Sequence, residues 1–150
     1  MPYNFLKAWG ANVYVCTRDK THQNLAQELG AVWTGGTLDQ LPVLLDGAVV
    51  FAPAGKIIPV GLKALDCAGR LILAGIHMSP ILSFSYDILY GERMVKSVTN
   101  NTKQDGVEFL EHAAKIGIKT HVQTFCLEDA NEALYALKYD RMQGVGVLIM

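Results

Sequence analysis

Histidine and cysteine are the side chains in this sequence that most often carry chemistry, and neither type forms a pattern. The four histidines are scattered, at His22, His77, His112 and His121. The three cysteines are widely spaced, at Cys16, Cys67 and Cys126. No cysteine lies near a histidine at the spacing of metal ligands, and no C-x-x-C occurs, which argues against a zinc knuckle and against a disulfide framework. The sequence therefore predicts no metal ligands, and we interpret each histidine as a surface or half-buried residue.

A basic turn, Thr17–Arg18, is the second candidate, and it follows the β-branched and aromatic run 12–16 (NVYVC). At the end of the second strand of a dinucleotide-binding domain, an acidic residue binds the ribose 2′-hydroxyl of NAD, whereas a small polar residue followed by a basic one suits a 2′-phosphate. The acidic Asp19 comes one step later. Taken alone, Arg18 is more often an ordinary solvated turn residue. Lys20 and His22 could assist it or could be surface residues at a helix start.

A glycine-rich phosphate loop is not found in this sequence. Gly35–Gly36 and Gly144/Gly146 are the only close glycine pairs. Neither gives the G-x-G-x-x-G spacing between a strand and a helix with which backbone N–H groups bind a pyrophosphate.

Strand and helix patterns alternate along the chain. Short apolar or β-branched runs predict strands at 12–16, 31–33, 47–51, 70–74, 94–98 and 145–150. Helical periodicity predicts helices at 21–29, 38–45, 57–65, 103–116 and 128–139. Gly30 is expected to end the first of these helices and Pro59 to lie in the first turn of the third, whereas Pro42 interrupts the second. We expect 47–51 to be buried on both faces.

Two of the predicted helices have an apolar side that should face a core. The residues expected to face inward on 103–116 are Val107, Phe109, Leu110 and Ala114. Those forming the apolar stripe on 128–139 are Ala133, Leu134 and Leu137. Strands alternating with helices at this spacing predict an α/β protein with a mostly parallel sheet.

Composition and charge exclude several classes of protein. The chain has 150 residues, 51% of them hydrophobic, with a net charge of -1, and no run of Lys or Arg that would indicate a nucleic-acid partner. The longest apolar stretches, 71–76 and 145–150, are too short to span a membrane, and the N-terminus has no signal-peptide pattern. We therefore expect a globular, cytoplasmic protein with reduced cysteines and no membrane partner.

Several segments in order resemble the cofactor domain of the zinc-dependent, medium-chain alcohol dehydrogenases. They read GANVYVCTRDK, LAQELGA, DGAVVFAPAG, GLKALDCAGRLILAGIHMS, LYGERMVKSVTNNTKQDGVEFLEHAAK and FCLEDANEALYALKYDRMQGVGVLIM. The resemblance runs from about Lys7 to Met150 and implies an incomplete Rossmann-type, doubly wound parallel sheet that lacks its first strand and glycine-rich loop. It implies that 1–8 is the tail of the helix after that loop, so that the chain is N-terminally truncated. It also implies a partial NAD(P)-binding domain at 1–126, and a helix and strand at 127–150 that return toward a catalytic domain.

The resemblance also implies a set of cofactor-binding residues. It favours NADP as the cofactor, bound through Thr17 and Arg18. The remaining implied residues follow later strands, and they are Ala52, Pro53, Ala54, Gly75, Ile76, His77, Thr99 and Asn100. The loops 52–54 and 75–77 would lie beside the nicotinamide ribose, although they fit simple turn chemistry equally well. Thr99 and Asn100 would lie beside the carboxamide. Arg141 stands upstream of the position where the family often has an arginine for the pyrophosphate. The family's zinc has no ligands in this sequence.

Two functions then compete. One is the cofactor domain of an NADP(H)-dependent alcohol or aldehyde oxidoreductase, without catalytic residues of its own and not catalytic alone. The other is a non-catalytic remnant that acts as a binding or oligomerisation module. The resemblance implies a homo-oligomer formed through 94–98, with 82–90 nearby.

The missing first strand would be central in the sheet, between 12–16 and 47–51. Either these two segments pair with each other, or another chain fills the gap, or the protein aggregates. We therefore expect that the chain alone is not a stable monomer.

Overall fold

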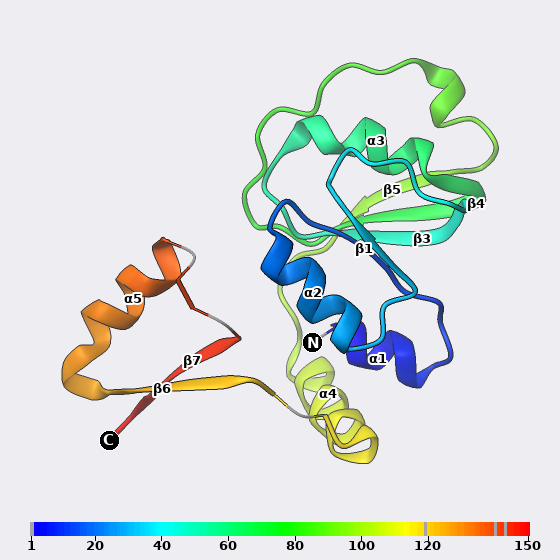
Figure 1. Cartoon of the computed structure of the whole chain (residues 1–150). Coiled ribbons are helices and arrows are strands. Elements are labelled where there is room, and N and C mark those ends of the chain that lie inside the picture. Colours follow the sequence, from blue (N-terminus) through cyan, green and yellow to red (C-terminus); the bar gives the residue numbers. More distant parts are fainter. Residues whose placement is uncertain (1, 119, 140, 143) are drawn as a thin grey trace.

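The computed structural model describes residues 2–118, 120–139, 141–142 and 144–150. Within these residues the strands form three separate parallel sheets, ordered β1–β2, β3–β4–β5 and β6–β7 (Figure 1). The helices α2, α3 and α5 connect three of the parallel pairs, and a long loop with the short turn η2 connects the fourth, β4 to β5. The predicted α/β class with parallel pairing is therefore confirmed.

The N-terminal unit holds the first sheet. Its elements are α1 (Pro2–Ala8), β1 (Tyr14–Cys16), α2 (Lys20–Glu28) and β2 (Trp33–Gly35). Gly30 follows the end of α2 with φ +99°, so the predicted glycine stop is confirmed. The strand β2 begins at Trp33, two residues later than predicted, where Tyr14 is its register partner. One residue before both strands, the backbone N–H of Val32 donates to the carbonyl of Val13 (2.9 Å).

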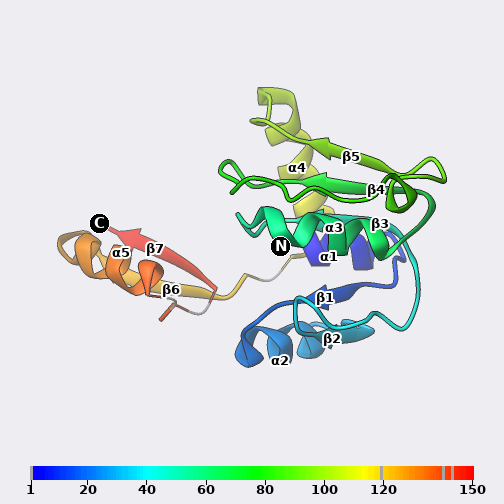
Figure 2. The ribbon, with the colours of Figure 1, turned by 90° about the horizontal axis from the view of Figure 1, so that it is seen from above.

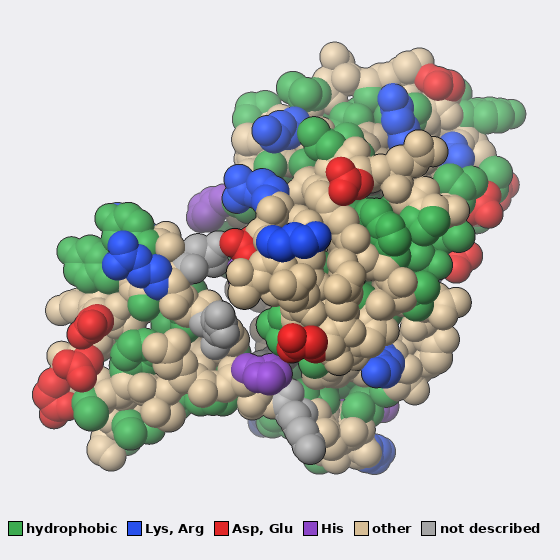
Figure 3. All heavy atoms as spheres, viewed as in Figure 1, with side chains coloured by type: hydrophobic (Ala, Val, Ile, Leu, Met, Phe, Trp, Pro, Cys, Tyr) green, Lys and Arg blue, Asp and Glu red, His purple; other side chains and the backbone are tan. Residues whose placement is uncertain are grey.

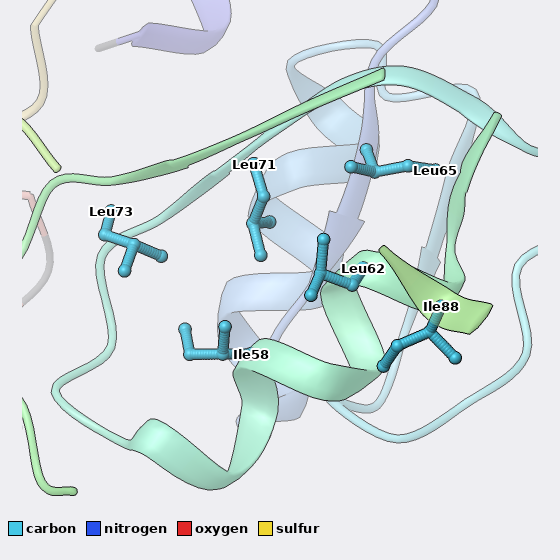
Figure 4. Close-up of a cluster of buried hydrophobic side chains, with 6 residues drawn as sticks. All are labelled: Ile58, Leu62, Leu65, Leu71, Leu73 and Ile88. Carbon is cyan, nitrogen blue, oxygen red and sulfur yellow. The ribbon is translucent and has the colours of Figure 1, made fainter. Parts of the chain in front are cut away.

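The central unit is the three-stranded sheet with one helix on it. Its elements are β3 (Leu45–Val50), η1 (Gly55–Ile57), α3 (Ile58–Lys63), β4 (Leu65–Leu73), η2 (Tyr86–Ile88) and β5 (Met94–Ser97). Pro59 lies in the first turn of α3, as predicted. The core forms where α3 packs on β4, and its fully buried side chains are Ile58, Leu62, Leu65 and Leu71 (Figure 4). The turn η2 closes this cluster with Ile88.

Two expectations for the central unit are wrong. The segment 38–45 is not a helix but a series of turns that leads into β3. The Asp39 carboxylate accepts a hydrogen bond from the backbone N–H of Gly36 (2.7 Å), which favours a turn, and Pro42 supplies no N–H for a helix. The strand predicted at 47–51 is not buried on both faces, since Gly47 is exposed and Val49 is 46% exposed. The reason is that Ala48 and Val50 pack on the core under α3, whereas Gly47 and Val49 alternate with them and lie on the opposite face of β3, away from that core.

Helix α4 (Lys103–Ile116) has the predicted bounds but not the predicted buried face. A capping box of Thr102 and Asp105 starts it, and Gly117 ends it with φ +68°. Val107, Phe109, Leu110 and Ala114 are all exposed, contrary to expectation. The helix lies against α1 through the rings of Phe109 and Phe5, whose centroids are 5.1 Å apart. No described helix is long and apolar enough to cross a membrane.

The C-terminal unit is a small βαβ arrangement that lies apart from the rest of the ribbon in both views (Figures 1 and 2). Its elements are β6 (Val122–Cys126), η3 (Leu127–Asp129), α5 (Ala130–Lys138) and β7 (Val145–Ile149). The strand β6 was not predicted, and it pairs along its whole length with β7. The apolar stripe expected on α5 is only partly buried, because Ala133 is 9% exposed whereas Leu134 and Leu137 are each 63% exposed.

The N-terminal sheet (β1–β2) and the central sheet (β3–β4–β5) lie next to each other without joining. Figure 2 shows their strands following one another as β2, β1, β3, β4 and β5. β1 and β3 nevertheless belong to different sheets. The sheet therefore does not close by pairing β1 with β3, which was one of the three outcomes considered for the missing central strand.

Candidate functional site

The candidate residues after β3, β4 and β5 leave the central sheet at one edge, the carboxyl ends of its strands. The backbone N–H of Ala74 donates to the carbonyl of Val50 (2.8 Å), and the N–H of Val98 donates to the carbonyl of Leu73 (3.1 Å). These bonds end the ladders at the same level, so the loops that follow begin side by side. The structure therefore brings together three groups of predicted residues: Ala52–Pro53–Ala54, Gly75–Ile76–His77 and Thr99–Asn100.

Two of these loops are bonded to each other through a residue that the sequence did not single out, Ser79. The Gly55 N–H donates to Ser79 Oγ (2.8 Å), and the Ser79 N–H donates to the carbonyl of Pro53 (3.3 Å). A Cβ added to Gly55 would lie 2.5 Å from the carbonyl oxygen of Ser79, so no larger residue fits there without moving that loop. In the sequence, the position of Ser79 before Pro80 is the one feature that indicates a loop residue. It does not reveal that Ser79 bonds to the loop after β3.

The exposed parts of this edge are available to a ligand. Ala52, Pro53, His77, Thr99 and Asn100 are exposed. Ile76 is 91% exposed and has little contact with the protein. Ligands of open parallel sheets bind beyond the carboxyl ends of the strands, which is where these loops lie.

Thr17 and Arg18 lie at the end of β1, in the other sheet. The Thr17 N–H donates to the carbonyl of Gly35 (2.9 Å), and Gln23 Nε2 donates to the carbonyl of Thr17 (2.8 Å). These bonds fix the backbone at this point. Arg18 is exposed. In the described chain no hydrogen bond links Thr17 or Arg18 to the loops after β3, β4 and β5.

Asp19, the acidic residue beside Arg18, caps helix α2. Its Oδ1 accepts hydrogen bonds from the backbone N–H groups of Thr21 (2.6 Å) and His22 (3.2 Å). These bonds lower the pKa of Asp19, so the group is ionised and directed at the helix. Lys20 Nζ donates to Gln23 Oε1 (3.0 Å), which ties this lysine to its own helix. Arg18 is thus the cation of this turn that the described contacts leave uncommitted.

No metal centre is found in the part of the chain that the structure describes. No group of three or more His, Cys, Asp or Glu side chains lies close enough to hold an ion. Cys16, Cys67 and Cys126 are all free. The residues present therefore do not fit a zinc ion.

Comparison with known proteins gives one curated relative of substantial identity. No family model matches the chain. The chain is 38% identical over 144 residues to "Probable alcohol dehydrogenase AdhA" of Mycobacterium tuberculosis, with 95% of this chain and 42% of that protein covered. The chain thus spans less than half the length of this relative.

Solved structures of alcohol dehydrogenases share the fold. The cinnamyl alcohol dehydrogenase SbCAD4 of Sorghum bicolor matches with a TM-score of 0.84 and 22% identity, over 99% of this chain and 43% of that one. The CAD of Helicobacter pylori, complexed with NADP(H), gives 0.86 and 22%, over 99% and 44%. The alcohol dehydrogenase of Aeropyrum pernix gives 0.82 and 21%, over 99% and 46%. The resemblance to the alcohol dehydrogenases, and the Rossmann-like fold that it implied, are confirmed.

Proposed function

We propose that this chain is the cofactor-binding part of an NADP(H)-dependent alcohol or aldehyde oxidoreductase. The observation that carries the proposal is the meeting of three loops at one carboxyl edge of the central sheet, in a chain 38% identical to an alcohol dehydrogenase. Bound there, the nicotinamide would supply reversible hydride transfer. The loops 52–54, 75–77 and 99–100 would hold its ribose and carboxamide.

The preference for NADP(H) rests on the turn after β1. The Arg18 guanidinium is exposed and can offer two parallel N–H donors to a 2′-phosphate. The Asp19 carboxylate is held by the first turn of α2 and so does not compete for a ribose hydroxyl. The NADP(H) bound in the Helicobacter pylori relative is consistent with this preference.

We further propose that the chain binds the cofactor weakly and does not turn over substrate alone. The sequence contains no G-x-G-x-x-G loop. Without the several N–H bonds that such a loop gives a pyrophosphate, a few kcal/mol of binding free energy are missing, and we expect a Kd above about 1 mM. The described residues hold no zinc ligands, so no step of the reaction is derived through a metal.

Titration followed by nuclear magnetic resonance tests both points, because it detects weak binding. NADP+ should shift the amide signals of Thr17 and Arg18 and of the loops after β3 and β4, more than NAD+ does. Arg18→Asp should shift the preference from NADP+ toward NAD+, because a carboxylate repels the 2′-phosphate and accepts a hydrogen bond from the 2′-hydroxyl. Lys115→Asp, the same charge change on the exposed face of α4, should leave it unchanged. Equal shifts with both cofactors in the unmodified chain would show that Arg18 is an ordinary surface residue, and a micromolar Kd would refute the proposed weak binding.

A role in assembly is the second candidate, and exposed apolar side chains favour it. Such side chains reach the surface over much of the face in Figure 3. Near β5, Leu82 is 57% exposed, Tyr90 68% and Val98 48%. We propose that this region forms a homo-oligomer, and that the three free cysteines indicate the cytoplasm. Light scattering after size-exclusion chromatography tests the assembly, since a monodisperse 16.4 kDa species would contradict it.

The two-part division at residues 126 and 127 remains a proposal. It places the C-terminal helix and strand in a segment that returns toward a catalytic domain. Because β6 pairs with β7 over all five of its residues, we propose that β6 belongs to the same structural segment as the C-terminal helix and strand.

A further inference from the structure

The long loop after β4 carries the predicted residues 75–77, and Ser79 attaches it to the rest of the protein. In the described structure two hydrogen bonds join the segment 75–84 to other parts of the chain, and both involve Ser79. The Ser79 N–H donates to the carbonyl of Pro53 (3.3 Å), and the Ser79 Oγ accepts from the N–H of Gly55 (2.8 Å). These two bonds fix the loop after β4 against the loop after β3.

Gly55 is a firm attachment point because it begins the helical segment that carries part of the core. It is buried, and η1 runs from it directly into α3, whose Ile58 and Leu62 are fully buried. A Cβ on Gly55 would overlap the carbonyl oxygens of Ser79 and Pro80, so the backbone of the loop after β4 lies directly on this glycine. The Ser79 hydroxyl therefore links that loop to a part of the protein that close packing holds in place.

The residues 75–77 form a short arch between two attachments. On one side, the Ala74 N–H donates to the carbonyl of Val50 (2.8 Å) at the end of β3. On the other side, Met78 packs against the hydrophobic core and Ser79 makes its two hydrogen bonds. The second and third residues of the arch are exposed, so their side chains do not anchor it in the core. The position of the arch therefore depends on the attachments at its two ends.

We propose that Ser79 is a positioning residue for the nicotinamide end of the cofactor, because its hydroxyl sets the spacing between the loops 52–54 and 75–77. This inference rests on the proposed function, in which those loops hold the nicotinamide ribose. Ser79 acts through the two loops and not on the hydride transfer itself. A surface that is already held in place loses less conformational freedom when a ligand binds, and so binds it more tightly. Removing the hydroxyl takes away the acceptor of the Gly55 N–H and releases one end of the arch.

The effect of Ser79 should be confined to one half of the cofactor. Thr17 and Arg18, the residues proposed for the adenosine 2′-phosphate, follow β1 in the other sheet. Among the described contacts no hydrogen bond joins either of them to Ser79. Loss of the Ser79 hydroxyl should therefore weaken binding of the nicotinamide half and spare the adenosine half. A role in stability alone would affect the two halves alike.

Titration of the whole chain with each half of the cofactor, followed by nuclear magnetic resonance, tests the proposal. The probes are nicotinamide mononucleotide and adenosine 2′,5′-bisphosphate. Ser79→Ala should raise the Kd for the mononucleotide, measured from the amide shifts of residues 75–77, at least about threefold. It should leave the Kd for the bisphosphate, measured at Arg18, unchanged. Ser79→Thr keeps the hydroxyl, and the exposed position has room for the added methyl group, so this variant should bind the mononucleotide as the unmodified chain does.

Thr124→Val is the matched control, because it removes one exposed hydroxyl from β6 in the C-terminal unit and should leave both Kd values unchanged. Equal binding of the mononucleotide by the unmodified chain and by Ser79→Ala would overturn the positioning role and leave the proposed function intact. If the mononucleotide shifted no amide of residues 75–77 in the unmodified chain, the positioning role and the proposed nicotinamide site would both be wrong. Weaker binding of both probes by Ser79→Ala, or no recovery in Ser79→Thr, would also overturn the positioning role.

Discussion

Replacing Leu71 by alanine should destabilise the central unit strongly and the N-terminal unit much less. Leu71 is fully buried against Ile58, Leu62 and Leu65. The substitution removes three buried carbons, worth about 2.4 kcal/mol of transfer free energy at about 0.8 kcal/mol each. The cavity cannot collapse easily, because β4 is held by β3 on one side and by β5 on the other. The free energy of unfolding of this unit should therefore fall by about 3–5 kcal/mol.

Urea unfolding followed by two signals tests this expectation. Trp9 and Trp33 both lie in the N-terminal unit, so their fluorescence reports on it, whereas far-ultraviolet circular dichroism also reports on the central sheet. In Leu71→Ala the dichroism midpoint should fall by roughly 2 M urea, and the fluorescence midpoint by much less, because no strand ladder joins the two sheets. Ile76→Ala, at a residue 91% exposed, should change the free energy of unfolding measured by either signal by less than about 0.5 kcal/mol. Equal shifts of both midpoints would show that the sheets unfold as one unit and would refute the reasoning.

Three further changes have definite expected outcomes. Gly55→Ala should destabilise the fold by about 1–3 kcal/mol and shift the amide signals of Ser79, because its Cβ would overlap the backbone carbonyl oxygens of Pro80 and Ser79. Gly106→Ala, where the nearest atom is 3.9 Å away, should instead stabilise α4, and urea unfolding that ranked the two variants the other way would contradict this. Arg93→Met should lower the free energy of unfolding in urea by about 2 kcal/mol or more, because the guanidinium donates to the carbonyls of Leu65 (3.0 Å) and Tyr90 (2.7 Å). If Arg93→Lys kept the full stability of the unmodified chain, that would argue against the contact with two carbonyls. Thr102 donates to the Asp105 carboxylate from its backbone N–H and from its hydroxyl, and these bonds lower the pKa of Asp105. The stability that they contribute is present above the ordinary carboxyl range and is lost as the pH falls through the lowered pKa. Asp105→Asn should therefore reduce the loss of α4 helicity below about pH 4, and an unchanged acid profile would show that the carboxylate contributes nothing to the cap.

The positions of several elements followed from the sequence because their signals are local. Helix α4 has the bounds that its helical periodicity predicted, and the structure adds that a Thr102 capping box starts it and Gly117 ends it, each within one turn of the backbone. Gly30 and Pro59 act in the same way on α2 and α3. The helix predicted at 38–45 was wrong for an equally local reason. The hydrogen bond from the Gly36 N–H to the Asp39 carboxylate favours a turn, although the apolar periodicity favoured a helix.

The candidate site was predictable only in outline. The residues that end the strands of a parallel sheet must meet at one edge, so the groups at 52–54, 75–77 and 99–100 could be named in advance. The bond between Gly55 and Ser79 could not, because it joins loops 24 residues apart whose separation depends on how α3 packs on β4.

The sequence by itself determined roughly where most helices and strands lie, because periodicity and turn chemistry act between residues close in the chain, although β4 begins at Leu65 and not at residue 70, and β6 was not predicted. Only the tertiary structure decided which of the apolar faces are buried. Leu110 and Leu134 stand on correctly predicted helices and are 68% and 63% exposed. Leu71 is fully buried because α3 covers one side of its strand. Burial and strand pairing require a second surface from a distant part of the chain, and where no described segment supplies one, as between β1 and β3, an apolar pattern remains at the surface.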